Sequence, residues 1–390
     1  MIVKSENAKK IDLYLRNNPC FRIGNWPIEL SGEKKIVPYY KFPLDLLFYN
    51  IKNGRFSIEK IEREKQIHRE LDPLDQEDAK IIRDLLLNIF PEKTQTLKED
   101  IRKKGQMEPG VITFDGFVIN GNRRMAILQE LHKEEPTGKW AYLEAVRLEP
   151  NINRKDVWKL EVGLQLSKEK KADYSPVNEL LKIREGEKAG LTPEEIAAAM
   201  YDWSGEEVKK SLERLVLIDT FLSFIKQPDN YELIQKTGLH EYFIDVQDHI
   251  LKKANQRGEK KNEILRQTEG AFRLIEAAFK KDGAKKTQVT HWDMRKLGKI
   301  YAAYSPKETY FEELAKKKKP SAEDIVEAYK TAEETYEMIE KKNEPMKLLS
   351  TAINALKNID TKSEHFHKEE VREKLSELSD EVTKLLNKLG

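Results

Sequence analysis

The stretch that decides the fold of the N-terminal half is Asp115-Gly116-Phe117-Val118-Ile119-Asn120-Gly121-Asn122-Arg123-Arg124-Met125-Ala126. Residues 109–114 and 117–120 are apolar runs separated by an Asp-Gly turn, which predicts the two strands of a hairpin. Residues 125–131 have a helical pattern. We therefore expect strand, turn, strand and helix in direct succession.

Two arginines, Arg123 and Arg124, stand at the start of the predicted helix. A helix start offers backbone N–H groups and the positive end of the helix dipole, which suit a phosphate group. Gly121 would let the backbone approach a ligand closely. From the residues alone, a phosphate site and a pair of ion pairs with surface carboxylates are equally supported.

Strands and helices alternate around this stretch. Residues 36–40 and 143–148 have strand patterns, and residues 57–90 predict one or two helices broken near Asp72-Pro73. Thr96 with Glu99 is typical of a capping box, which predicts a helix from there to Lys104. Residues 35–150 therefore predict an α/β domain, preceded by an N-terminal extension at 1–34.

Everything after residue 151 has a helical pattern, so the predicted fold class is α+β. Thr192-Pro193-Glu194-Glu195 is a strong helix start, and Ser204 with Glu207 opens the next helix. Two short helices so closely joined predict a helix-turn-helix within a helical domain at 151–245. A structural packing unit is the alternative.

The C-terminal region, 246–390, is basic and then acidic. Residues 250–305 hold 14 Lys and Arg against 6 Asp and Glu, whereas residues 306–390 hold 16 against 19. The last helix carries a heptad stripe, which predicts either an intrachain hairpin or a homodimer seam. Its members are Val371, Leu375, Leu378, Val382, Leu385 and Leu389.

Composition limits the classes of protein. The 390 residues are 39% hydrophobic and 35% charged, with a net charge of +2. No apolar run approaches the roughly 20 residues of a membrane span, so no membrane partner is expected. The single cysteine, Cys20, excludes an intrachain disulfide. With no apolar signal-peptide core at the start, we expect a cytoplasmic protein.

The segment Gly121-Asn122-Arg123-Arg124-Met125-Ala126 resembles the Gly-Glu-Arg-Arg-x-x-Ala box of the ParB/sulfiredoxin superfamily. Residues 105–109 resemble the segment that leads into the strand of that family, and residues 50–55 resemble its upstream box. Residues 161–165 resemble its third box, and residues 174–179 resemble the helix after that box. The resemblance spans roughly residues 35–220. It implies a ParB-like nucleotide-binding domain followed by a helix-turn-helix, in a divergent member outside the partition proteins.

The resemblance implies a nucleotide site. Gly121, Asn122, Arg123 and Arg124 would hold the phosphates, Arg55 would assist, and Glu161 would be catalytic and would face Mg²⁺. Asn122 replaces the usual glutamate, the third box lacks its asparagine and arginine, and residues 56–93 form an insertion. ATP or CTP is the expected nucleotide, with ATP favoured.

The implied function is a Mg²⁺-dependent nucleoside triphosphatase that works on or beside DNA, as an accessory subunit of a DNA-modification or defence system with a protein partner. One alternative is a non-catalytic DNA-binding partition or regulatory protein that nucleotide switches. Another is a small-molecule kinase with Asp45 as its catalytic carboxylate. The candidate DNA contacts are Lys209, Lys210, Arg214, Lys285 and Lys286.

Overall fold

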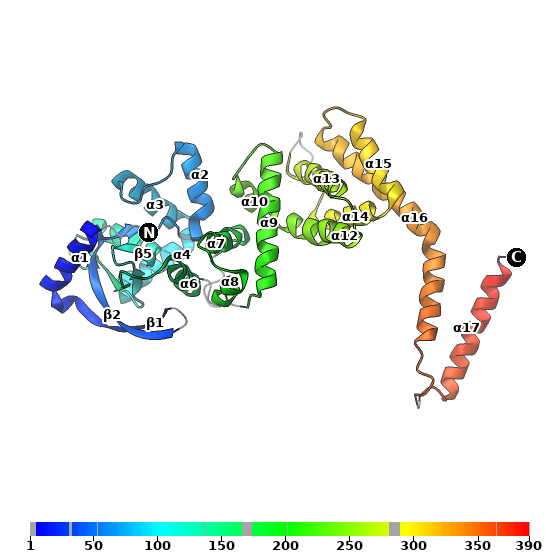
Figure 1. Cartoon of the computed structure of the whole chain (residues 1–390), viewed down its shortest axis with the longest axis horizontal. Coiled ribbons are helices and arrows are strands. Elements are labelled where there is room, and N and C mark those ends of the chain that lie inside the picture. Colours follow the sequence, from blue (N-terminus) through cyan, green and yellow to red (C-terminus); the bar gives the residue numbers. More distant parts are fainter. Residues whose placement is uncertain are drawn as a thin grey trace. The chain divides into compact units, whose positions relative to one another are not determined.

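The predicted hairpin lies inside a mixed β-sheet (Figure 1). The computed structural model describes residues 5–30, 33–52, 54–136, 138–165, 174–200, 202–280, 289–363 and 365–389. Strands β4 (Gly110–Ile112) and β5 (Phe117–Asn120) pair antiparallel. Gly116 turns the chain between them with a φ of 96°, which favours glycine. Helix α5 (Asn122–Glu134) follows at once, so this succession is confirmed.

Six strands form the sheet, in the order β1-β2-β6-β4-β5-β3. Strand β4 is parallel to β6 and antiparallel to β5, and β3 is parallel to β5. The α+β fold class is therefore confirmed. The other strands are β1 (Arg22–Leu30), β2 (Glu33–Pro43), β3 (Phe48–Tyr49) and β6 (Tyr142–Arg147).

Helices cover both faces of the central strands, because the strand side chains alternate between two cores. Val118 of β5 belongs to a core with α5 and neighbouring helices, whereas Ile119 packs toward α6 (Arg154–Gln165). The helices that share the first core are α1 (Ser5–Asn17), α3 (Gln76–Asn88) and α4 (Pro91–Lys104).

Residues 5–30 are part of the sheet domain, although the sequence placed them in a separate extension. Strand β1 pairs with β2 along most of its length. The Asn7 side chain donates to the carbonyl oxygens of Leu46 and Asp115 at 3.1 and 2.7 Å. Ile11 is fully buried in the core shared with α5. The domain boundary at residue 35 therefore does not correspond to a structural boundary.

The two predicted helix starts that follow are confirmed. Helices α8 (Pro193–Ala199) and α9 (Gly205–Phe224) each begin with a complete capping box, at Thr192 and Ser204. The remaining helices around them are α2 (Ser57–Ile67), α7 (Pro176–Lys188), α10 (Tyr231–Thr237), α11 (His240–Asp245), a π-helical turn at Val246–Leu251, α12 (Lys252–Gln256), α13 (Lys261–Phe279) and α14 (His291–Ala302). Three short 3₁₀ turns lie at Pro19–Phe21, Leu44–Leu46 and Gly54–Phe56.

The chain divides into two compact units, Met1–Gly298 and Lys299–Gly390. The second contains α15 (Tyr304–Ala315), α16 (Ala322–Lys357) and α17 (Glu369–Asn387). Tyr310 of α15 is fully buried and Tyr329 of α16 is nearly so, whereas no residue of α17 is buried. The leucines and Val382 of the heptad stripe are exposed and Val371 is half-buried, so the homodimer seam stays a prediction. None of the described helices is long and apolar enough to cross a lipid bilayer.

Helices α6 and α7 pack so closely that one position admits only glycine. A Cβ atom added to Gly186 of α7 would lie 2.7 Å from a ring carbon of Trp158 in α6. The Trp158 indole N–H also donates to the Lys182 carbonyl oxygen at 3.2 Å. The ring is therefore fixed and cannot move aside for a methyl group.

We expect Gly186→Ala to lower the free energy of unfolding by about 1–3 kcal/mol, because overpacking outweighs the gain in helix propensity. Gly163 of α6 is the matched control, since it is exposed and a Cβ atom there meets nothing within 4 Å. Gly163→Ala should stabilise the chain by up to about 1 kcal/mol. Urea denaturation of both variants measures the difference, and equal effects of the two would contradict this packing.

Candidate functional site

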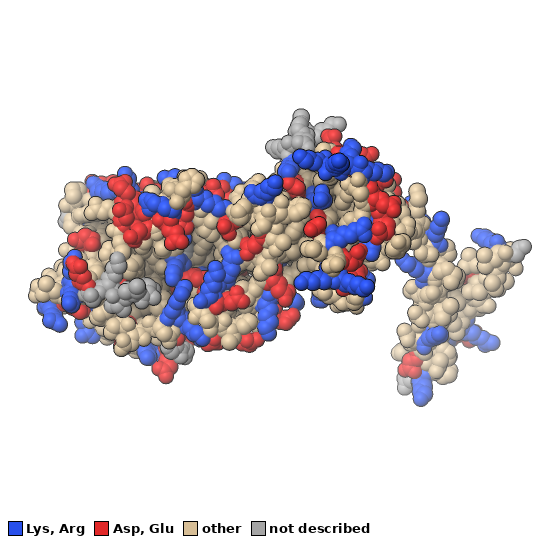
Figure 2. All heavy atoms as spheres, turned by 45° about the horizontal axis from the view of Figure 1, so that its top comes forward, with Lys and Arg blue, Asp and Glu red and all other residues tan. Residues whose placement is uncertain are grey.

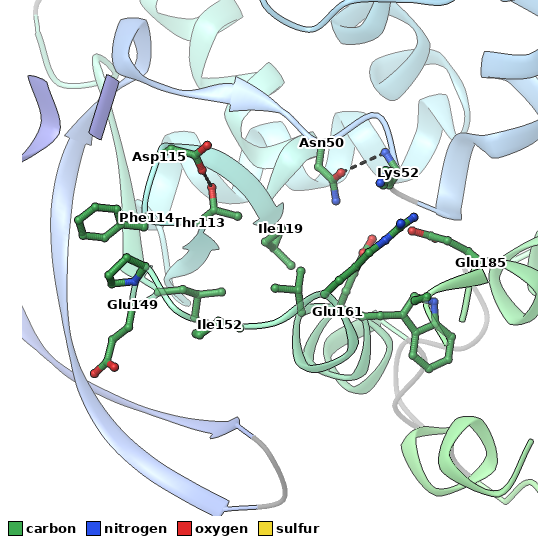
Figure 3. Close-up of a pocket in the computed structure, with 16 residues that line it drawn as sticks. Asn50, Lys52, Thr113, Phe114, Asp115, Ile119, Glu149, Ile152, Glu161 and Glu185 are labelled. Carbon is green, nitrogen blue, oxygen red and sulfur yellow. Dashed lines mark hydrogen bonds between the residues drawn. The ribbon is translucent and has the colours of Figure 1, made fainter. Parts of the chain in front are cut away.

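A groove lies between the α6 side of the sheet, helix α6 and the segment that follows β3 (Figure 3). Its middle is apolar, with Ile119, Leu148 and Ile152 among its lining residues. One end is polar and contains charged side chains from three different segments: the segment after β3, α6 and α7. The residues at that end are Asn50, Lys52, Arg154, Glu161 and Glu185.

The opposite end of the groove is formed by the turn between β4 and β5. Phe114 and the carboxylate of Asp115 lie there, and the Thr113 hydroxyl donates to Asp115 Oδ1 at 2.5 Å. The Arg147 guanidinium stacks 3.9 Å from the centre of the Phe114 ring and donates to the Phe114 carbonyl oxygen at 2.9 Å. This end therefore offers a fixed aromatic ring beside hydrogen-bonding oxygens.

A buried ion-pair network closes the charged end. Lys182 of α7 is 1% exposed, and its Nζ lies 2.9 Å from Glu161 Oε2 and 2.8 Å from Glu185 Oε2. Burial disfavours the charged ammonium, but the two carboxylates outweigh that cost and raise the pKa of Lys182. Lys182 is therefore charged and neutralises much of the negative charge of Glu161 and Glu185.

Further positive charge converges on the same place. Burial against the groove lowers the pKa of Lys52, and repulsion from Arg154 and Lys182 lowers it further, against the opposing effect of Glu185 and Glu161. Three cations thus face two carboxylates at this end of the groove. An anionic ligand would relieve the repulsion between the cations.

The start of α5 adjoins this end through a hydrogen bond. The backbone N–H of Asn50 donates to Asn122 Oδ1 at 3.0 Å, and Asn122 Nδ2 donates to the Val118 carbonyl oxygen at 2.6 Å. Asn122 is 2% exposed, so its side chain joins β3 to β5 and is not directed to a phosphate. Gly121 has a φ of 106°, which explains glycine at this position without a ligand.

The two arginines of the helix start do not line the groove. The Arg123 guanidinium lies 5.5 Å from the centre of the Phe90 ring at the start of α4. Arg124 donates to the Glu108 carbonyl oxygen, and burial lowers the pKa of its guanidinium. The two arginines at the start of α5 therefore contact other residues of the chain, Phe90 and the backbone of Glu108.

Of the other predicted site residues, Arg55 follows Gly54, which lies against the Lys182 side chain, whereas Asp45 lies elsewhere. Arg55 lies in the 3₁₀ turn Gly54–Phe56, and its carbonyl oxygen accepts from Asn178 Nδ2 of α7 at 3.2 Å. Asp45 is exposed and lines a different pocket, beside Tyr49 and Gln129, so the structure does not bring it to Glu161. Sequence reasoning missed Lys52, Arg154, Lys182 and Glu185. The signal for Lys182 was a lysine between Leu181 and Ile183 on an apolar helix face.

A divalent cation at Glu161 does not fit the residues found there. Over the described ranges, no group of three or more His, Cys, Asp and Glu side chains could hold a metal ion. Glu161 is bound to Lys182 instead, and the third acceptor near that ammonium is the Lys52 carbonyl oxygen at 3.4 Å. Mg²⁺ needs about six oxygens at about 2.0–2.1 Å, whereas these oxygens surround an ammonium group.

The three candidate DNA contacts on α9 differ in how their side chains interact with the rest of the chain. Lys209 pairs with Glu194 at 3.2 Å and Lys210 with Glu206 at 4.0 Å, both at the surface. Arg214 is half-buried and donates to Gln247 Oε1 at 3.2 Å, so its guanidinium is directed into the chain. Lys285 and Lys286 lie outside the described residues. Figure 2 shows Lys and Arg side chains interspersed with Asp and Glu over the visible face.

Replacing Lys52 should stabilise the ligand-free chain. Its folded-state pKa is lowered, so protonation opposes folding, and this cost fades as pH rises through the folded-state pKa. We expect Lys52→Met to raise the melting temperature at pH 7, and the gain to shrink at alkaline pH. Thermal denaturation across a pH series measures it, with Lys9→Met on the exposed surface of α1 as the control. A fall at pH 7 would contradict the crowding of cations.

Comparison with known proteins assigns no family to the chain. No protein-family model matches it, and no curated protein matches its sequence. The likeness to the ParB/sulfiredoxin superfamily therefore consists of the motifs themselves.

Proposed function

We propose that this chain binds a nucleoside triphosphate in the groove and acts, in response to it, on or beside DNA. The observation that carries the proposal is the crowding of three cations, Lys52, Arg154 and the buried Lys182, against two carboxylates at one end of the groove. Triphosphate would occupy this end, beside the start of α5. The base would lie against the half-buried Ile152, toward Phe114 and Asp115.

A nucleotide-switched binding protein is the form of this function that the groove favours. Hydrolysis would need a carboxylate free to orient water, and Glu161 is held by Lys182. Ligand binding at Lys52 would instead act on the segment 50–58, which contacts both α5 and α7. ATP and CTP remain the leading ligands.

Hydrolysis of the bound nucleotide is a second candidate, because Glu161 is a groove-lining carboxylate near the proposed phosphate position. Release of inorganic phosphate by the wild-type chain separates the two forms. The kinase alternative gains nothing from Asp45, which lines another pocket.

The nucleotide site is tested by thermal stabilisation with ATP, CTP, GTP and ADP. A ligand at 100 times its dissociation constant should add about 2.7 kcal/mol to the free energy of unfolding. We expect Lys52→Ala/Arg154→Ala to lose this stabilisation, because it removes both cations of the groove. Lys103→Ala/Lys104→Ala, which removes the same charge from exposed positions at the end of α4, should retain it.

The Arg123→Ala/Arg124→Ala variant tests whether the helix-start arginines also hold phosphate, as the resemblance implies. Because neither arginine lines the groove, this variant should keep the stabilisation of the control, and a loss would place the phosphates at the helix start instead. A wild-type chain that no nucleotide stabilises would overturn the proposal, as would a groove variant that responds like the wild type.

The DNA-binding part of the proposal rests on Lys209 and Lys210, which are exposed on α9. Each lysine that contacts a phosphate contributes about 0.9 to the slope of log affinity against log salt concentration. We expect Lys209→Ala/Lys210→Ala to lower that slope by about 1–2 and to weaken binding to all duplexes alike. Fluorescence anisotropy over a salt series measures this, and an unchanged slope would exclude these lysines.

A further inference from the structure

The ammonium of Lys182 joins three segments at the charged end of the groove. Its Nζ donates to Glu161 of α6 at 2.9 Å, to Glu185 of α7 at 2.8 Å and to the carbonyl oxygen of Lys52 at 3.4 Å. Glu161 is 2% exposed, and both partners of this pair are therefore withdrawn from water. All three N–H donors of the ammonium are directed to protein oxygens.

The three oxygens around Lys182 are arranged like the ligands of a metal ion, and the lysine ammonium occupies the position of the ion. Two carboxylates from different helices and one carbonyl oxygen are a typical oxygen donor set for a divalent ion. Without Lys182, Glu161 and Glu185 would repel each other and would also repel an anionic ligand in the groove. The Lys182 ammonium reduces the repulsion between the two carboxylates and their repulsion of an anionic ligand, without a bound metal.

We propose that Lys182 takes the place of a divalent metal at this groove, so that the chain binds its triphosphate ligand in the absence of Mg²⁺. The inference rests on the proposed function for the identity of the ligand. The cation site itself rests on the contacts of Lys182 alone. Lys52 and Arg154 then supply the positive charge that faces the phosphates.

The cation site can be tested without any nucleotide. Mn²⁺ titration followed by electron paramagnetic resonance, and Tb³⁺ luminescence sensitised by the nearby Trp158, report metal binding. We expect the wild-type chain to show neither signal from this site. Lys182→Met should gain one bound ion, because it leaves Glu161 and Glu185 facing each other without a counter-ion.

Lys182→Met/Glu185→Gln is the matched control, since it lacks one carboxylate and should lose the gained ion. Metal binding by the wild-type chain that Glu185→Gln abolishes would overturn the proposal. This comparison needs no Lys182 variant, so it decides the matter even where Lys182→Met does not fold. A folded Lys182→Met that binds no ion would also count against it.

The ligand half of the proposal is tested on the wild-type chain. The dissociation constant of the stabilising nucleotide should change by less than about threefold, under 1 kcal/mol, between EDTA and MgCl₂. Binding only with MgCl₂ would overturn the role of Lys182 and leave the nucleotide function standing. Absence of binding in both buffers would overturn the nucleotide function, while the Mn²⁺ and Tb³⁺ titrations would still decide whether Lys182 fills the cation site.

Discussion

The buried ammonium of Lys182 is the interaction on which the rest of the groove depends. It connects α6, α7 and the segment after β3 at a point that water does not reach. A buried charge of this kind is expensive to expose or to leave without its partner, typically about 3–5 kcal/mol. The network therefore fixes where α7 lies against α6, and Gly186 permits the close contact with Trp158 that follows.

The segment 50–58 connects this ion-pair network to the sheet. On one side Asn50 bonds to Asn122 at the start of α5, and on the other the Ile58 N–H donates to Asn178 Oδ1 of α7 at 3.3 Å. These bonds involve backbone groups of the segment, so the Lys52 side chain is not used in them. Lys52 uses that freedom to face the groove. A ligand bound at Lys52 would therefore contact a segment whose two ends are hydrogen-bonded to α5 and α7.

Local signals in the sequence predicted much of the fold. The Asp-Gly turn, the strand patterns and the capping boxes at Thr192 and Ser204 each depend on neighbouring residues, and the structure has them. The predicted helix start at Thr96 was wrong, because α4 already begins at Pro91. The Thr96 hydroxyl donates to the Glu92 carbonyl oxygen inside the helix. The groove could not be predicted this way, since Lys52, Arg154 and Lys182 are far apart in sequence. Only tertiary packing brings them together.

Helix α16 is continuous over 36 residues, yet it consists of two physically different halves. From Ala322 to Ala332 it has buried side chains, whereas residues 341–357 are exposed throughout. Pro345 lies within the exposed part, where it removes one backbone hydrogen bond. Beyond Pro345 no residue is buried, although Lys347 pairs with Glu340 across the proline, and a helix so short is marginal in water. The buried N-terminal part of α16 should therefore stay helical under conditions in which the residues after Pro345 unfold.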